Sequence, residues 1–376
     1  MLLANKDILS KRVLFGGYYG MDNVGDDCFC AISTWGAKRY WNTKKIFLLS
    51  SKDVDGPIKT SSCLSGKQSF RGQIKIQSYL EIVRSSCFIM SGGSMFCFKL
   101  SVHDPRRISL LASKLGITPI GAIGVSLGPY ESIIDQKSVH KYLRELQFLA
   151  LRDKASYDEA CSINLPFKPI MAADLAMLLP EMVPEAQYLH SENNVLGIIV
   201  CHYERYCNGN IENEKRREDI ILSALLKLIE EGYDGVFRLF VFNSNVYNGD
   251  QGITLEFLSK LRNNGAKVEL VHYSLNPVAI WKKVAECTAI ISTRLHGAIF
   301  AAAGNIPCCL IEYHIKCSNF LSDIGVSEKW IIGDACCSSK DLAGKLSDLL
   351  RNQQVNYYPK RQQLIEMAKL NFTFDK

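Results

Sequence analysis

The chain has 376 residues, of which 47% are hydrophobic and 22% are charged, and its formal net charge at pH 7 is +6. This length exceeds one ordinary hydrophobic core and predicts two globular domains of roughly 150 to 200 residues each. Lysine and arginine are scattered without long runs, which argues against a nucleic-acid partner and leaves an anionic substrate or an acidic membrane surface open.

In the first half, short runs of β-branched or aromatic residues alternate with amphipathic segments. Strands are expected at residues 12–18, 45–50, 87–92, 118–125 and 148–153. The helices expected between them include residues 26–41 and 104–116. This alternation is typical of a parallel sheet in which helical crossovers join successive strands.

Residues 180–194, PEMVPEAQYLHSENN, break this rhythm with two prolines and a polar string, which predicts a linker. Strands resume at residues 195–202, 235–242, 266–273, 287–293, 306–313 and 329–333, with helices at 212–231, 251–264 and 296–304. We therefore predict an α/β fold with two doubly wound, Rossmann-like domains, residues 1–185 and 193–376, that face each other across a cleft.

Fourteen cysteines lie largely inside apolar runs such as SSCFIMSG and IPCCLIEY, and no Cys-x-x-Cys pair occurs. This distribution predicts buried thiols in a reducing compartment and argues against a zinc site. No run of about 18 uncharged apolar residues is present, and the first residues lack an apolar core of signal-peptide length. We expect a cytoplasmic protein, with attachment to the inner face of the membrane as the open alternative.

The segment ISTRLHGAIFAAAGNIP, residues 291–307, places Arg294 and His296 at a turn between a strand and a helix. The first turn of a helix carries unpaired backbone N–H groups and the positive end of the dipole, which stabilise a bound phosphate. Arg294 adds a fork of donors, and His296 adds a group that transfers protons near neutral pH. The alternative is structural: an arginine paired with a neighbouring carboxylate and an interior histidine.

Glycine-bearing turns follow two strands of the first half. FGGYYGMDNVGDDCFC surrounds the end of the first strand with glycines, and Asp26 or Asp27 opens the next helix. SGGSMF follows the third strand with Gly92, Gly93 and Ser94. These turns allow close approach of a ligand to the backbone, although the spacing is neither G-x-G-x-x-G nor a Walker A loop, and Asp26 is most simply a helix N-cap.

GVSLG, residues 124–128, matches the nucleophile elbow of α/β-hydrolases. That motif requires a helix directly after the serine, whereas Gly128-Pro129 imposes a turn. We interpret the segment as a glycine-bearing loop that lines the cleft.

Taken in order, these motifs resemble those of the polysaccharide pyruvyl transferase family over most of the chain. GYYGMDNVGDD, MSGGSMF, GVSLGPY, LRDKAS and AADLAMLLP are similar to successive segments of the family's first domain. STRLHGAIFAAAGNIPCCLIEYHIKCSNFLSDIG resembles its Arg-x-His helix start, Tyr-x-x-Lys strand end and Phe-Leu helix. The resemblance implies a GT-B-like pair of domains. It also implies transfer of the enolpyruvyl group of phosphoenolpyruvate onto two sugar hydroxyls, giving a pyruvate ketal and phosphate.

Under this resemblance Arg294 holds the anion, and His296 binds the phosphate or donates a proton. Tyr313 and Lys316 complete the donor pocket, while Asp26, or else Asp27, binds acceptor hydroxyls or removes a proton. Further substrate-binding candidates are Gly17, Tyr18, Asn23, Gly25, Gly92, Gly93, Ser94 and Leu295. GIIVCHYERY departs from the family where an arginine is expected, so His202 and Arg205 are both candidates for the donor carboxylate.

No metal or cofactor is expected, because phosphoenolpyruvate is a substrate and no clustered carboxylates of metal-binding spacing occur. The acceptor is a sugar or glycan, with a lipid-linked precursor as an open possibility, and the oligomeric state is left open. A nucleotide-sugar glycosyltransferase, with Glu312 on a ribose, and a non-catalytic sugar-binding scaffold remain alternatives. The basic, amphipathic C-terminal segment PKRQQLIEMAKLNFTFDK is expected to pack back across the first domain, with membrane contact as its alternative.

Overall fold

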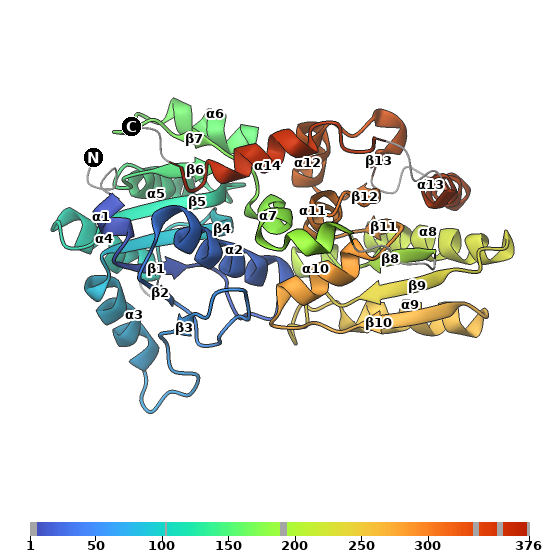
Figure 1. The fold of residues 1–376 in the computed structure, drawn as a ribbon, viewed down its shortest axis with the longest axis horizontal. Helices are drawn as coiled ribbons and strands as arrows, with labels where there is room; N and C mark the ends of the chain where they lie inside the picture. The colour runs from blue at the N-terminus through green and yellow to red at the C-terminus, as the bar shows by residue number, and fades with distance from the viewer. Residues whose placement is uncertain (1–5, 102–103, 189–193, 334–337, 352–355, 374–376) are drawn as a thin grey trace.

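Two parallel sheets organise the chain into two α/β domains (Figure 1), as the sequence predicts. The computed structural model describes residues 6–101, 104–188, 194–333, 338–351 and 356–373. The first sheet has seven strands in the order β3-β2-β1-β4-β5-β6-β7, and the second has six in the order β10-β9-β8-β11-β12-β13. In each sheet the first strand in sequence is central and the order reverses beside it, which is the Rossmann arrangement.

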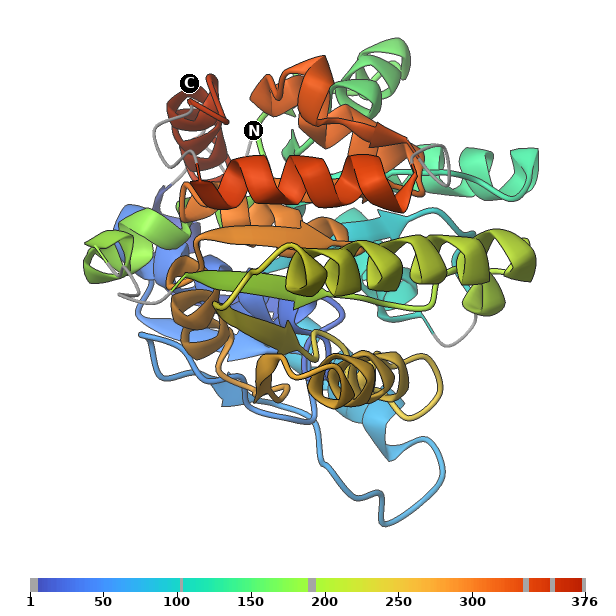
Figure 2. The same cartoon turned by 90° about the vertical axis from the view of Figure 1, so that its right-hand side faces the viewer.

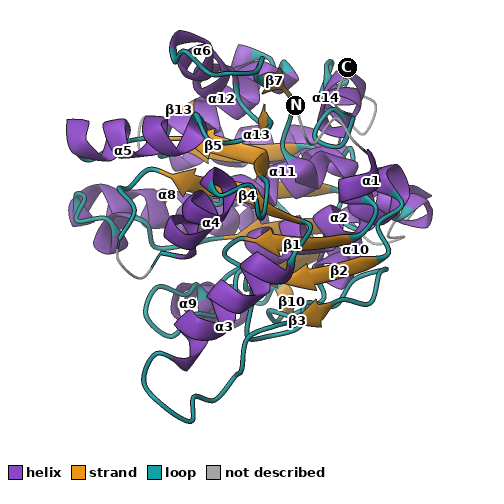
Figure 3. Cartoon of the chain, turned by 90° about the vertical axis from the view of Figure 1, so that its left-hand side faces the viewer, coloured by secondary structure: helices purple, strands orange, loops and turns teal. Residues whose placement is uncertain are grey.

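The first domain buries its central strands on both faces because helices cover the sheet. Its strands are β1 Arg12–Gly16, β2 Lys45–Leu48, β3 Ser61–Ser62, β4 Cys87–Phe96, β5 Ile120–Leu127, β6 Leu149–Leu151 and β7 Ile170–Met171. Its helices are α1 Lys6–Leu9, α2 Val24–Trp41, α3 Gln73–Arg84, α4 Pro105–Lys114, α5 Ile133–Leu143 and α6 Lys154–Ser162. Figure 3 shows α3 and α4 side by side on the outer end of this domain.

The second domain repeats the pattern. Its strands are β8 Val195–Ile199, β9 Val236–Phe240, β10 Lys267–Val271, β11 Ala289–Ser292, β12 Cys308–Glu312 and β13 Ile332–Gly333. Its helices are α8 Ile211–Glu230, α9 Gln251–Asn263, α10 Pro277–Ala285, α11 Leu295–Ala303, α12 Ile315–Ile324 and α13 Ser339–Arg351. Helices α8 and α13 pack against each other at the far end of the molecule (Figure 2).

The reversal of strand order places two crevices on the molecule. One lies beyond the ends of β1 and β4, and the other beyond the ends of β8 and β11. Ligands of open parallel sheets bind in such crevices. One glycine-bearing segment follows β1, the other forms the last part of β4, and the Arg294–His296 turn follows β11, so both sets of predicted site residues lie at a switch point.

Two segments differ from the turns expected of them. SGGSMF continues β4 to Phe96, and its pairing with β5 shifts register between Gly93 and Phe96. The positive φ angles of Gly92 (74°) and Gly93 (76°) explain the irregularity, since regular strands have negative φ. GVSLG lies mostly inside β5, so the loop expected there is wrong, and Ser126 does not enter a helix as a nucleophile elbow would.

Much of the expected linker is packed structure. The segment forms helix α7, Leu179–Met182, followed by a 3₁₀ helix, Pro184–Tyr188. Pro180, Met182 and Val183 are buried, because this segment inserts apolar side chains into the main core. Residues 189–193, the rest of the expected linker, lie outside the described residues.

The last helix, α14 (Arg361–Lys369), returns across the junction toward the first domain (Figure 1). Its buried side chains include Leu364 and Ile365, so its apolar face is covered by protein. Beyond it, Phe372 stacks on Tyr40, and the indole of Trp41 donates a hydrogen bond of 2.7 Å to the Phe372 carbonyl. This packing covers the apolar face that the sequence offers for membrane contact.

Across the described part of the chain, the structure contains no helix with the length and apolar character that spanning a bilayer requires.

Replacing Asn371 by alanine tests this return of the chain. The Asn371 side chain is fully buried, accepts a bond of 2.7 Å from the Gly124 N–H, and donates to the Ala173 carbonyl at 3.0 Å. Its loss leaves a buried donor unpaired and should lower the free energy of unfolding by about 1–3 kcal/mol. Chemical denaturation measures this, and the exposed Asn264→Ala serves as the matched control. Equal losses in the two variants would contradict the assigned role.

Candidate active site

The turn after β11 is fastened to the end of β8. The Cys201 N–H donates to the Thr293 hydroxyl at 2.9 Å, and Thr293 is buried. Helix α11 begins at Leu295, with Arg294 in extended conformation at its N-cap. The small and apolar residues that follow His296, GAIFAAA, are all buried, so the N-terminus of the helix is fixed at the switch point.

Arg294 is held from behind by a buried carboxylate. Its Nε donates to Asp250 Oδ2 at 2.9 Å, and its Nη2 forms a second ion-pair contact with Oδ1. Asp250 is fully buried and also accepts from the Asn243 N–H at 3.0 Å, whereas the Arg294 side chain keeps 22% exposure. The pair orients the guanidinium, as in the structural alternative, and leaves one side of it exposed.

His296 lies at the contact between the domains. Its imidazole packs edge-on against the Phe29 ring of α2, with centroids 5.0 Å apart. It also lies directly against Gly25, where an added Cβ would come within 2.2 Å of Nδ1. Its Nε2 is inaccessible and has no hydrogen-bond partner among the described residues. Burial lowers the pKa of His296 to about 4, against the opposing Asp174 carboxylate, so the ring is neutral at pH 7.

Arg152 and Lys316 approach the same place from opposite domains. Lys316 Nζ donates to the Ser94 hydroxyl at 2.6 Å, and Arg152 reaches this hydroxyl at 3.4 Å. Arg152 is anchored by Asp174 at 2.7 Å and by Ser126 at 2.7 Å. Burial and the charge of Arg152 lower the pKa of Lys316.

These cations meet around His296. After burial and Asp174, the groups that shift the His296 pKa are Arg152, Arg294 and Lys316, which all lower it. Arg152 and Arg294 are paired with Asp174 and Asp250, whereas the Lys316 amine donates to the Ser94 hydroxyl. The group around the neutral imidazole therefore carries an excess of positive charge that can attract an anion. A small cavity of about 40 Å³ between the domains borders Arg152 and Lys316.

Asp26 faces this group from the start of α2. It is half-buried, and its carboxylate lies beside Gly93, whose missing Cβ would sit 3.5 Å from Oδ1. Burial and the neighbouring Asp27 raise the pKa of Asp26 to about 7, although Arg152 and Arg294 oppose the shift. Near neutral pH this carboxyl can therefore both give and take a proton.

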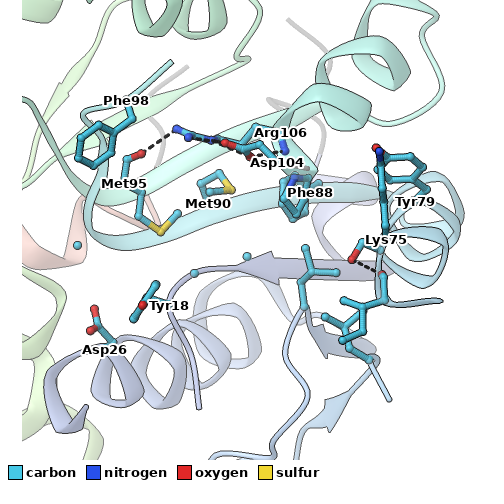
Figure 4. A pocket seen from close by; sticks show the side chains of 18 of the residues that line it. Tyr18, Asp26, Lys75, Tyr79, Phe88, Met90, Met95, Phe98, Asp104 and Arg106 are labelled. Carbon is cyan, nitrogen blue, oxygen red and sulfur yellow. Dashed lines mark hydrogen bonds and ion pairs between the residues drawn. The ribbon is translucent and has the colours of Figure 1, made fainter. Parts of the chain in front are cut away.

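A larger cavity of about 880 Å³ opens on the first domain beside Asp26 (Figure 4). Tyr18 and Asp26 line one end, and Lys75 and Tyr79 of α3 line the other (Figure 4). Its remaining walls are largely apolar and include Phe88, Met90, Met95, Phe98 and Arg106. Ser94 also lines it, so the large cavity adjoins the cationic group through Ser94 and Asp26.

Several predicted site residues hold the framework. Both Asp27 oxygens are used, one accepting from the Gly20 N–H at 2.7 Å and the other from the Tyr273 hydroxyl at 2.7 Å, and the residue is fully buried. Asn23 caps α2 and pairs with Asn243 of the second domain. We assign these residues to positioning α2 and the domains.

Of the remaining predicted residues, Gly17 and Leu295 line the two cavities, while Gly92 and Tyr313 pack against aromatic rings. Gly17 lies against the Tyr19 ring, and Gly92 against the Phe29 ring. Leu295 borders the small inter-domain cavity. The Tyr313 ring packs against Tyr203 in a tilted arrangement, with a centroid distance of 4.6 Å and an interplanar angle of 59°.

Both candidates for the donor carboxylate are tied to α8. His202 Nδ1 lies 2.6 Å from Glu218, and Arg205 Nε donates to Glu214 at 2.6 Å. Within the described ranges, His202, Glu214 and Glu218 are the one group of histidine and carboxylate ligands close enough to hold a metal ion. Because Arg205 and the Tyr203 N–H already occupy Glu214, we interpret this group as an ion-pair network.

Sequence reasoning missed four residues that shape the site: Arg152, Asp174, Asp250 and Ser126. Arg152 lies in LRDKAS and Asp174 lies in AADLAMLLP. Both segments resemble the family, but the sequence alone assigns no role to either residue. Asp250 has no such signal, since it lies 44 positions from Arg294.

The sequence model of the family described as polysaccharide pyruvyl transferase matches residues 8–315. The fold is similar to the UDP-GlcNAc 2-epimerase from Methanocaldococcus jannaschii, with a TM-score of 0.61 and 12% identity over 96% of this chain and 98% of that chain. The UDP-GlcNAc 2-epimerase from Neisseria meningitidis, bound to UDP-GlcNAc, gives a TM-score of 0.57 and 14% identity over 95% and 93%. The α,α-trehalose 6-phosphate synthase from Burkholderia multivorans gives 0.51 and 10% over 96% and 93%. At these identities the solved structures show the shared GT-B-like fold alone.

Gly25→Ala tests the contact between α2 and His296. The new methyl would lie 2.2 Å from Nδ1, so the ring or the domains must move, and stability should fall by about 1–3 kcal/mol. Gly252→Ala on α9 is the matched control, because nothing lies within 4 Å of its Cβ, and it should be neutral or slightly stabilising. Thermal unfolding of both variants measures the difference. A Gly25→Ala protein as stable as its control would disprove the close packing.

Asp26→Asn tests the raised carboxyl pKa. The pKa of Asp26 is about 4 in the unfolded chain and about 7 in the folded protein. Between these pH values the carboxyl ionises more readily in the unfolded chain, so the free energy of unfolding falls as the pH rises through this range. Asparagine removes this cost, so the variant should match its parent near pH 4 and exceed it above pH 7. The gain is up to about 4 kcal/mol, reduced by solvent screening.

Denaturant unfolding at pH 4, 6 and 8 measures the effect of Asp26→Asn, with the exposed Asp348→Asn as control. A difference between variant and parent that does not change with pH would refute the assignment.

Proposed function

Because the chain belongs to the polysaccharide pyruvyl transferase family, we propose that it transfers the enolpyruvyl group of phosphoenolpyruvate to two hydroxyls of a sugar. The sugar belongs to a glycan, a polysaccharide or a lipid-linked precursor, and the products are a pyruvate ketal and phosphate. The observation that carries the proposal is the unpartnered Nε2 of His296, set among Arg152, Arg294 and Lys316 beside the proton-exchanging Asp26.

The cationic group suits this donor in size and charge. Phosphoenolpyruvate carries a phosphate and a carboxylate on three carbons, so both anions must be bound within a few ångströms. Arg152 and Arg294 are already oriented by Asp174 and Asp250, which reduces the entropy lost when they bind an anion. Lys316 contacts Ser94 through its amine, and a bound phosphate can replace that contact.

The two titratable groups suit the proton transfers. With its pKa near 7, Asp26 is partly protonated at neutral pH and is our candidate donor to the methylene carbon of the enol. His296 is neutral in the free site and offers Nε2 to the phosphate. A bound phosphate dianion favours the protonated ring, so donor binding should raise its pKa.

The proposed reaction balances without a redox partner or metal step. A proton from Asp26 forms the methyl group, and the first sugar hydroxyl adds to the resulting cationic carbon. The carbon–oxygen bond to phosphate then breaks, and the second hydroxyl adds to the same carbon. The two hydroxyls release two protons, of which one restores Asp26 and the other leaves with phosphate.

The large cavity is the proposed acceptor site. The ring of Tyr18, 57% exposed at its mouth, and the ring of Phe98 offer faces on which a sugar can stack. Asp26 lies at the end of this cavity that adjoins the cationic group. Hydroxyls of a sugar bound there can approach the donor carbon from the first domain.

We also propose a cytoplasmic location. Free thiols are found at every cysteine that the structure describes, which fits a reducing compartment. A sugar acceptor that awaits export is the substrate class that such a location supplies.

Lys316→Met tests the donor site with little risk to the fold, because the side chain keeps a similar length and the change removes the hydrogen bond from its amine to the Ser94 hydroxyl. Arg294→Ala is less suitable, since it would leave Asp250 buried without its partner. Loss of one group that stabilises developing charge should reduce kcat/KM for phosphoenolpyruvate by about 100-fold. Lys260→Met, in an exposed ion pair on α9, is the matched control.

Phosphate release in the presence of candidate acceptors, with mass analysis of the product, measures this effect. Protection from thermal unfolding by phosphoenolpyruvate and not by nucleotide sugars separates the proposal from a glycosyltransferase. Turnover of a nucleotide sugar, or full activity of Lys316→Met, would overturn it.

A further inference from the structure

The outer face of α3 and α4 exposes an unusual number of large apolar side chains. Ile76, Leu80 and Val83 form one stripe along α3, at the spacing of successive helical turns. We define the α3–α4 face as this stripe with its exposed neighbours in the loop before α3 and around α4. Its apolar members, 43–65% exposed, are Phe70, Ile76, Leu80, Val83, Leu111, Leu115 and Ile117.

The face is continuous across the two helices. Helices α3 and α4 are in contact, and both turn toward the outer end of the first domain (Figure 3). A shallow hollow beside α4 is lined mainly by α4 and α5, and Tyr79 of α3 borders it as well. Single exposed apolar residues are common on proteins, whereas a group of this extent marks a binding surface.

The exposed charged side chains of the same face are predominantly basic. Residues 63–84 and 104–117 contain seven lysines and arginines against two acidic residues, in a chain whose net charge is only +6. The exposed basic side chains are Lys67, Arg71, Arg84, Arg107 and Lys114. Arg84 lies 3.4 Å from Glu81, and Lys114 lies 3.3 Å from Glu145. Glu81 also pairs with Arg12, and Asp104 pairs with Arg106.

We propose that the α3–α4 face docks on an anionic membrane surface. Its apolar side chains enter the boundary between headgroups and acyl chains, and its lysines and arginines contact the lipid phosphates. The charge favours this occupant over a second copy of the chain, since an isologous dimer through this face would bring its positive charges together.

The position of the large cavity supports the same occupant. Lys75 and Tyr79, on the inner side of α3, line the cavity whose other end holds Asp26 (Figure 4). Asp104 and Arg106, at the start of α4, line it as well. If the proposed function holds, a sugar carried on a lipid can occupy the cavity from the end lined by α3 and the start of α4 and reach Asp26, while its lipid stays in the bilayer.

Flotation of the full-length protein with vesicles tests the proposal without any activity measurement. Binding is expected to vesicles of phosphatidylglycerol and phosphatidylcholine in equal parts, and to weaken by about tenfold or more with pure phosphatidylcholine or at high salt. Leu80→Glu should weaken binding to the anionic vesicles by about tenfold or more, and Arg107→Glu by a smaller factor.

Matched controls lie on α9 of the second domain. Leu255→Glu and Arg262→Glu change exposed helical residues far from the face and should leave vesicle binding unchanged. Circular dichroism of each variant shows whether its fold is retained, and Ile76→Ser provides a second, uncharged change of the stripe.

Three outcomes would overturn the proposal. These are absence of vesicle binding, equal loss in the α9 controls, or a change in solution mass on Leu80→Glu that reveals a dimer. Transfer to a short, lipid-free acceptor should be unchanged in Leu80→Glu. Vesicle binding without any transfer from phosphoenolpyruvate would instead refute the proposed function and leave the membrane surface in place.

Discussion

The close contact between the first turn of α11 and the start of α2 determines the site. His296 can lie against Gly25 only because that position has no side chain, and this brings the switch points of the two sheets together. A hydrogen bond of 2.6 Å from Lys316 Nζ to the Ser94 hydroxyl connects the two domains at the same place. Separating the domains here would part His296, Arg294 and Lys316 of the second domain from Arg152 and Asp26 of the first, so neither domain alone contains the full set.

The charged groups at this contact differ in how they are paired, since the two arginines have carboxylate partners whereas Asp26 and His296 have none within the described part of the chain. Asp250 and Asp174 hold Arg294 and Arg152 in fixed orientations. Burying these ion pairs costs desolvation free energy, and a bound anionic ligand that contacts the same arginines would offset part of that cost. Asp26 and His296 have pKa values shifted toward their neutral forms, because burial disfavours charge on both. At pH 7 the His296 ring is therefore neutral and the Asp26 carboxyl is only partly ionised, beside two arginines held in place, which is an arrangement compatible with the proposed anionic donor.

The sequence predicts what depends on local pattern and misses what depends on distant partners. The apolar runs and the small-residue helix after His296 gave most strands and α11 within a few residues, because period and capping are local. The contact of Asp250 with Arg294 and that of Ser94 with Lys316 could not be predicted, since 44 and 222 positions separate the two partners in the sequence. The expected linker failed because its prolines start short helices and its apolar residues are buried. The candidate site residues remain predictions that the geometry makes chemically coherent.

The two amphipathic segments show why a surface cannot be assigned from sequence alone. The C-terminal segment has an apolar face that the fold covers, because α14 buries Leu364 and Ile365 against protein. In α3, apolar residues occur on two sides, and only the fold shows that Ile82 enters the core while Ile76 and Leu80 remain outside. Hydrophobic periodicity identifies a helix that has an apolar face, but the sheet decides which face is buried. The basic residues around the exposed side of α3 then bear on which partner it binds. They favour the proposed anionic lipid headgroups over a second copy of the same positive surface.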